Sequence, residues 1–123
     1  MAGEMKLGGS EQVESFGLTF LNRVADAFNA VLMEQGVRAP EARQELLGGL
    51  MFALAMELDD GSAVAQDGDA EIVPLMCFAR RDVESGDVTE IYPPDGSFDY
   101  HDYAHSAADG AVNEPPDGPV TTA

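Results

Sequence analysis

Two histidines four residues apart, His101 and His105, lie in the segment FDYHDYAHSAADG at residues 98–110. On a helix such a pair shares one face, with about 5–6 Å between neighbouring Cβ atoms, and both imidazoles can ligate one zinc ion. On a strand the same four residues span about 13 Å, too far for one ordinary metal ion. The chemistry available to this segment therefore depends on its secondary structure.

The residues around the histidines predict a strand. PPDGS at 93–97 is typical of a turn, and FDYHDY at 98–103 alternates aromatic with polar side chains. This prediction separates the two imidazoles and favours ordinary surface histidines, with a pH-sensitive contact to the following tail as the remaining hypothesis. If the segment is helical, a metal site becomes the alternative.

An acidic loop at residues 57–71 is the second place where a cation could bind, since it holds six acids and no base. Calcium takes six to eight oxygen ligands, but the calcium-loop spacing is absent here. Counted from Asp67, position six is Ile72 instead of glycine, and position twelve is Phe78 instead of glutamate. We therefore predict a solvated loop. The residues that a metal site would use are His101, His105, Asp67, Asp69 and Glu71.

Motifs for nucleophilic or nucleotide chemistry are missing from the sequence. No serine lies in a Gly-x-Ser-x-Gly context, and neither a phosphate-binding loop nor a dinucleotide fingerprint occurs. Cys77 is the only cysteine and lies in an apolar run, where a thiol is inert packing. The sequence predicts a protein that is not an enzyme and uses no cofactor.

Charge is the most unusual property of the chain. It carries 23 acidic and six basic residues, a net charge of −17, and no lysine or arginine follows Arg81. Such a field disfavours direct binding to nucleic acid or to an anionic membrane and favours a basic protein surface. We predict a non-catalytic acidic binding module, such as an adaptor, chaperone or inhibitor. The acids expected to bind the partner are Asp59, Asp60, Asp67, Asp69, Asp95, Asp99 and Asp102.

Three other functions fit the same charge. A nucleic-acid mimic would inhibit a DNA-binding protein by presenting carboxylates in place of phosphates. A metal-binding protein or enzyme would use His101, His105 and the 57–71 acids. The third is no specific function at all, because acid excess also keeps proteins hydrated in a high-salt source.

The predicted fold is α+β in a single small domain. Apolar residues recur at spacings of three and four from Ser10 to Gly36, and again from Pro40 to Leu58, which predicts an antiparallel helical hairpin. Runs at 71–83, 88–92 and 98–103 predict a three-stranded antiparallel β-meander packed against the hairpin. We place a flexible leader at 1–9, the domain at 10–104, and a disordered acidic tail at 105–123.

The second predicted helix is apolar almost all round, which suggests that a second copy of the chain covers part of it. The residues expected at this homodimer interface are Leu47, Leu50, Phe52 and Leu54. The N-terminus lacks the apolar core of a signal peptide, and no run approaches the roughly 18 apolar residues of a membrane span. With a single cysteine, the simplest compartment is the reducing cytoplasm.

Overall fold

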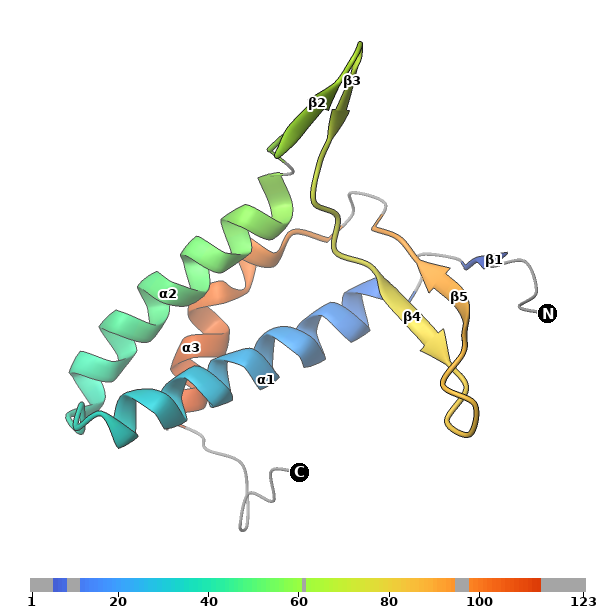
Figure 1. Ribbon diagram of the computed structural model, residues 1–123. Coiled ribbons are helices and arrows are strands. Elements are labelled where there is room, and N and C mark those ends of the chain that lie inside the picture. The colour runs from blue at the N-terminus through green and yellow to red at the C-terminus, as the bar shows by residue number, and fades with distance from the viewer. Residues whose placement is uncertain (1–5, 9–11, 61, 95–97, 114–123) are drawn as a thin grey trace.

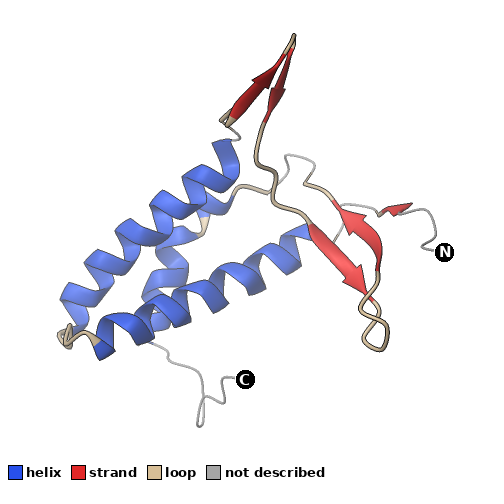
Figure 2. Ribbon diagram, viewed as in Figure 1, coloured by secondary structure: helices blue, strands red, loops and turns tan. Residues whose placement is uncertain are grey.

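The computed structural model describes residues 6–8, 12–60, 62–94 and 98–113, and it confirms the α+β class (Figure 1). Helices and strands occupy separate parts of the molecule (Figure 2). In chain order the elements are β1 (Lys6–Leu7), α1 (Val13–Glu34), α2 (Pro40–Asp60), β2 (Ala65–Asp67), β3 (Ala70–Ile72), β4 (Phe78–Arg81), β5 (Val88–Tyr92), the 3₁₀ helix η1 (Tyr100–Asp102) and α3 (Ala104–Asn113).

The two long helices lie where the apolar spacing predicts them, and a short link joins them. Gly36, at φ +93°, ends the first helix in a conformation that favours glycine, and Pro40 opens the second. The two helices spread apart from this link instead of packing along their whole length, and α3 lies between them (Figure 1). The core is therefore built from three helices.

The third helix replaces two predicted features, the strand at 98–103 and the start of the disordered tail at 105. Both predictions are wrong for the described residues, because 100–102 form η1 and 104–113 form α3. Alanines at spacings of three and four make up the buried face of α3, and such small side chains give a weak apolar signal. These are Ala104, Ala107, Ala108 and Ala111. Residues 114–123 lie outside the description.

The strands form two small sheets instead of one meander. In the first sheet β5 pairs with β4 in antiparallel fashion and with β1 in parallel fashion, in the order β1-β5-β4. Residues 6 and 7, assigned to a flexible leader from the sequence, therefore belong to the sheet. β2 and β3 pair with each other in a separate hairpin that projects from the helices (Figure 1). The predicted strand 71–83 is interrupted at 73–77, a segment that contains Pro74, which cannot donate to a ladder.

Gly17 lies in α1 at the point where Phe98 packs against the helix. A Cβ at this position would lie 2.6 Å from Cε2 of the Phe98 ring. The ring has little room to retreat, because Tyr100 packs edge-on at 4.8 Å and Tyr103 stacks at 5.3 Å between centroids. By contrast, a Cβ on Gly49, in the middle of α2, would meet no described atom within 4 Å.

The two glycines give a matched pair of substitutions. Gly17→Ala should lower the free energy of unfolding by about 1–3 kcal/mol, because overpacking against Phe98 exceeds the gain in helix propensity. Gly49→Ala should raise the free energy of unfolding by up to about 1 kcal/mol, because the added methyl meets open space. Urea unfolding monitored by circular dichroism measures both. Equal effects of the two substitutions would contradict the packing described here.

Candidate functional site

Asp59, near the C-terminal end of α2, binds the segment that contains the first histidine. Its Oδ1 accepts the backbone N–H of Tyr100 at 2.8 Å, and its Oδ2 accepts the backbone N–H of His101 at 2.7 Å. The same Oδ2 lies 2.7 Å from Nδ1 of the His101 ring. One carboxylate thus closes η1 and anchors the imidazole. This contact is the physical reason that 98–103 turns instead of continuing as a strand.

A second carboxylate lies on the other side of the same ring, with Asp102 Oδ1 3.3 Å from His101 Nε2. The hydrogen bond to Asp59 raises the pKa of His101 above its ordinary value, and the negative charges of Asp102 and Asp99 add to this shift. The imidazole between Asp59 and Asp102 is therefore stabilised in its charged form. Both ring nitrogens are engaged by carboxylates of the same chain.

Asp59, Asp99 and His101 form the one group of three metal-capable side chains found within the described residues, with ligand atoms within 4.8 Å of one another. Their geometry fits a hydrogen-bonded ion pair better than a metal centre. Two ligands on a tetrahedral zinc with bonds of about 2.0 Å lie about 3.3 Å apart. The Asp59–His101 separation of 2.7 Å is instead a hydrogen-bond distance with a proton between the atoms.

The second histidine is not part of this group. The ring of His105 stacks on Phe52 of α2, with 5.5 Å between centroids and 25° between planes, and lies over Gly48. His101 meets Phe52 edge-on at 6.3 Å. The two imidazoles thus both pack on one phenylalanine instead of converging on a shared point. The close contact expected for Gly48 exists, but His105 of α3 makes it and α1 does not.

The other predicted metal ligands are placed elsewhere. Asp67 ends β2, Asp69 lies in the following turn and Glu71 lies in β3, all exposed on the projecting hairpin (Figure 1). They do not group with either histidine among the described residues. The five residues proposed from the sequence therefore do not assemble into one site.

The acids predicted to bind a partner also differ in their availability. The side chain of Asp59 is only 10% exposed and is engaged with His101, so it is not free for a partner. Asp95 lies outside the described residues. The acids that remain exposed on the described surface are Asp60, Asp67, Asp69, Asp99 and Asp102.

The outward face of α2 is apolar and uncovered by the described chain. We call this set the outer stripe; its members follow one another at spacings of three and four along one side of the helix, and all are exposed. The outer stripe consists of Leu46, Gly49, Leu50, Ala53 and Met56. Leu46 and Leu50 are 49% and 48% exposed. The only basic residue of α2, Arg43, is buried on the opposite side, so acids alone border the outer stripe.

The residues predicted for a homodimer interface overlap only partly with the outer stripe. Leu50 belongs to it, and Phe52 lies beside it under the two histidines. Leu47 is fully buried within its own chain and Leu54 is half-buried. Leu47 therefore packs in the core of one chain and is not available to a second copy.

A groove between α1 and the β4–β5 hairpin is a feature that the sequence analysis missed. It encloses about 410 Å³. Aromatic rings and two arginines line it: Phe16, Phe20, Phe78, Tyr92, Arg23 and Arg80. Phe16 and Phe20 fit the same apolar spacing as Val24 and Phe28, and that spacing does not reveal that they face the hairpin. The signal that could have marked the groove is the placement of scarce arginines beside aromatic residues.

The raised pKa of His101 gives a pH dependence with a definite sign. The Asp59–His101 contact stabilises the fold fully below the unfolded-state pKa of about 6.5, and this stabilisation is lost as the pH rises through the higher folded-state value. The urea midpoint of the wild type should therefore fall over this range, beyond any fall seen in His101→Gln. His105→Gln, whose ring stacks on Phe52, is the matched control and should keep the wild-type dependence. The reverse pattern between the two variants would contradict this assignment.

No described helix is long and apolar enough to cross a membrane. Comparisons of the chain with protein-family models, with curated proteins and with solved structures found no match in any of the three.

Proposed function

We propose that this protein is a non-catalytic acidic binding module that uses the outer stripe of α2 to hold a basic amphipathic helix of a partner protein. The observation that carries the proposal is the outer stripe itself. A helix that is apolar on all sides is expected to be covered on all sides. The described chain covers α2 only where α1, η1 and α3 pack against it.

The shape of the outer stripe suits a helix as the occupant. Gly49 and Ala53, four residues apart, make a shallow strip with little side chain, and Leu46 and Leu50 lie beside it. Small residues at such spacing let a second helix approach closely, since the distance between packed helices depends on the side chains at the contact. Gly49 has no neighbour within its own chain that explains a glycine in mid-helix.

The charge around the outer stripe favours a basic occupant over a second copy of this chain. Glu45 and Glu57 lie on exposed positions beside the stripe, and Asp60 follows at its C-terminal end. A second α2 would bring the same carboxylates against these, in a chain that already carries −17. A helix with an apolar face bordered by lysine or arginine would pair with them, in the groove-binding manner of amphipathic helices.

The remaining exposed acids support capture of such a partner at a distance. Carboxylates on the β2–β3 hairpin and after η1 carry the same sign as those around the outer stripe. A field of one sign raises the association rate of an oppositely charged partner, and salt weakens this effect. Nucleic-acid mimicry is less well supported, because the described acids are distributed over separate elements instead of following one face.

A synthetic helical peptide with leucine on one face and lysine on the others is a direct probe. Titration calorimetry should show saturable binding that weakens with salt. Leu46→Ser combined with Leu50→Ser should weaken binding about tenfold or more, since burial of each leucine contributes about 1.5–3 kcal/mol. A peptide of the same composition with its leucines scattered round the helix should bind no better than it does to the double variant.

Val83→Ser is the matched control, because this side chain is 97% exposed in the turn between β4 and β5 and should not affect peptide binding. Unchanged peptide affinity in the double leucine variant would refute the outer stripe as the docking face. Light scattering should give 13.0 kDa for the free protein. A species of twice that mass that dissociates in the double variant would show instead that a second copy occupies the outer stripe.

A further inference from the structure

The groove between α1 and the β4–β5 hairpin has an aromatic floor. Phe78 lies edge-on to both Phe16 and Phe20 of α1, at 5.6 and 6.2 Å between centroids. Tyr92, opposite Phe78 in the β4–β5 pairing, also lies edge-on to Phe16 at 5.7 Å. Beyond these contacts the groove remains open, and its volume of about 410 Å³ is within the range of small-molecule sites.

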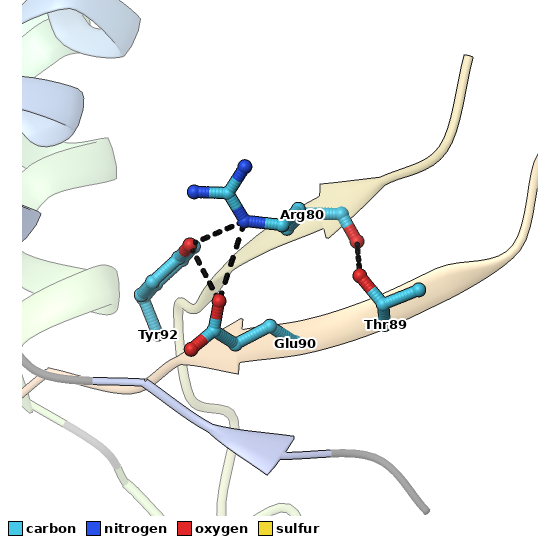
Figure 3. A network of polar contacts seen from close by, with 4 residues as sticks. All are labelled: Arg80, Thr89, Glu90 and Tyr92. Atoms are coloured by element: carbon cyan, nitrogen blue, oxygen red, sulfur yellow. Dashed lines mark hydrogen bonds and ion pairs between the residues drawn. The ribbon is translucent and has the colours of Figure 1, made fainter. Parts of the chain in front are cut away.

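Two guanidinium groups line the same groove. Arg23 of α1 lies with its Cζ 5.8 Å from the centroid of the Phe20 ring, a cation–π distance. Arg80 of β4 donates its Nε–H to the Tyr92 hydroxyl at 3.0 Å and to Glu90 at 3.3 Å. Figure 3 shows that the two terminal nitrogens of Arg80 are turned away from Glu90 and Tyr92.

This geometry holds Arg80 in place while leaving its bidentate end available. The Tyr92 hydroxyl also donates to Glu90 at 2.9 Å, so the three side chains form a closed network (Figure 3). The described residues give the terminal nitrogens of Arg80 no hydrogen-bond partner. A pre-positioned guanidinium with two parallel N–H donors matches the geometry of a carboxylate.

The position of these arginines is unusual for this chain. Only six of its 123 residues are lysine or arginine, and two of the six line the one groove with an aromatic floor. The overall field of a −17 chain repels anions, so positive charge here opposes the rest of the molecule. Local positive charge above apolar rings complements a ligand that is itself negative at one end and apolar at the other.

We propose that the groove is a binding site for a small apolar carboxylate, with its aromatic or branched aliphatic body on Phe16, Phe20, Phe78 and Tyr92 and its carboxylate between Arg23 and Arg80. This site is separate from the outer stripe of α2 and does not depend on the function proposed for it. It requires no change in the aromatic contacts already present, because the ligand enters from the open side between the two arginines.

The test compares three probes with one aromatic body: 3-phenylpropanoate, 3-phenylpropanol and 3-phenylpropylammonium. The net charge of the protein alone predicts that the ammonium binds best and the carboxylate worst. The groove predicts the opposite order. In a titration followed by amide chemical shifts, the carboxylate should bind about tenfold more tightly than the alcohol, as expected for charge-assisted hydrogen bonds. Its shifts should centre on residues 16–23, 78–80 and 92.

Substitution of the arginines separates the site from general hydrophobic binding. Arg23→Gln with Arg80→Gln should abolish the preference for carboxylate over alcohol while leaving weak binding of the alcohol. Both side chains are exposed, so the fold should survive. Arg38→Gln, at an exposed position in the link between α1 and α2, is the control and should leave the preference unchanged.

Three results would overturn the proposal. One is an ammonium probe that binds as tightly as the carboxylate. Another is a carboxylate preference that persists in the double arginine variant. The third is the absence of saturable shifts around the groove up to the solubility limit of 3-phenylpropanoate.

Discussion

Four alanines on one face of α3 let this helix lie against α1 and α2 at once, and the other elements depend on that contact. Ala104 and Ala108 are fully buried, and Ala107 and Ala111 are at most 5% exposed. Larger side chains on this face would push the two long helices further apart. Their spread, and with it the exposure of the outer stripe on the far side of α2, therefore follows from the size of the side chains on α3.

Polar contacts fix α3 at both of its ends. At the C-terminal end Arg43 donates to Asn29 Oδ1 at 2.8 Å, and Asn29 donates to the backbone carbonyl of Ala111 at 3.2 Å. The buried charge of Arg43 lies near the last carbonyls of α3, where the helix dipole is negative. At the other end Asp59 holds η1, which leads directly into α3. An apolar face of small side chains defines no strong register alone, and these two contacts supply it.

The sequence was sufficient for the elements whose signals are local, and insufficient where distant residues decide. The two long helices were predicted from apolar spacing and from Gly36 and Pro40, and β5 from its β-branched and aromatic residues. The segment 98–103 was assigned to a strand because Phe98 and Tyr100 alternate with polar residues. They are indeed buried, with Asp99 exposed between them. Their backbone turns because Asp59, about forty residues earlier, accepts two of its N–H groups, and no local pattern reports that.

Candidate sites follow the same rule. His101 and His105 stood out by type and spacing, but the role of each is decided by Asp59 and Phe52 on α2. The aromatic groove combines residues from α1, β4 and β5, which meet only in three dimensions. Charge composition could indicate a class of partner, whereas the surface that would contact it had to be found from burial on α2. Leu47 and Leu50 illustrate the difference, since one is enclosed in the core and the other faces solvent.

The position of α3 along the chain has a consequence for how the protein forms. Residues 104–113 contribute four of the core side chains, and they follow every other described element in sequence. During synthesis from the N-terminus, α1 and α2 emerge long before the helix that separates them. Until then each of these helices exposes the surface that α3 will cover, as well as the outer stripe. The nascent chain therefore remains without a complete core for most of its synthesis, and its excess of negative charge is what keeps such intermediates apart.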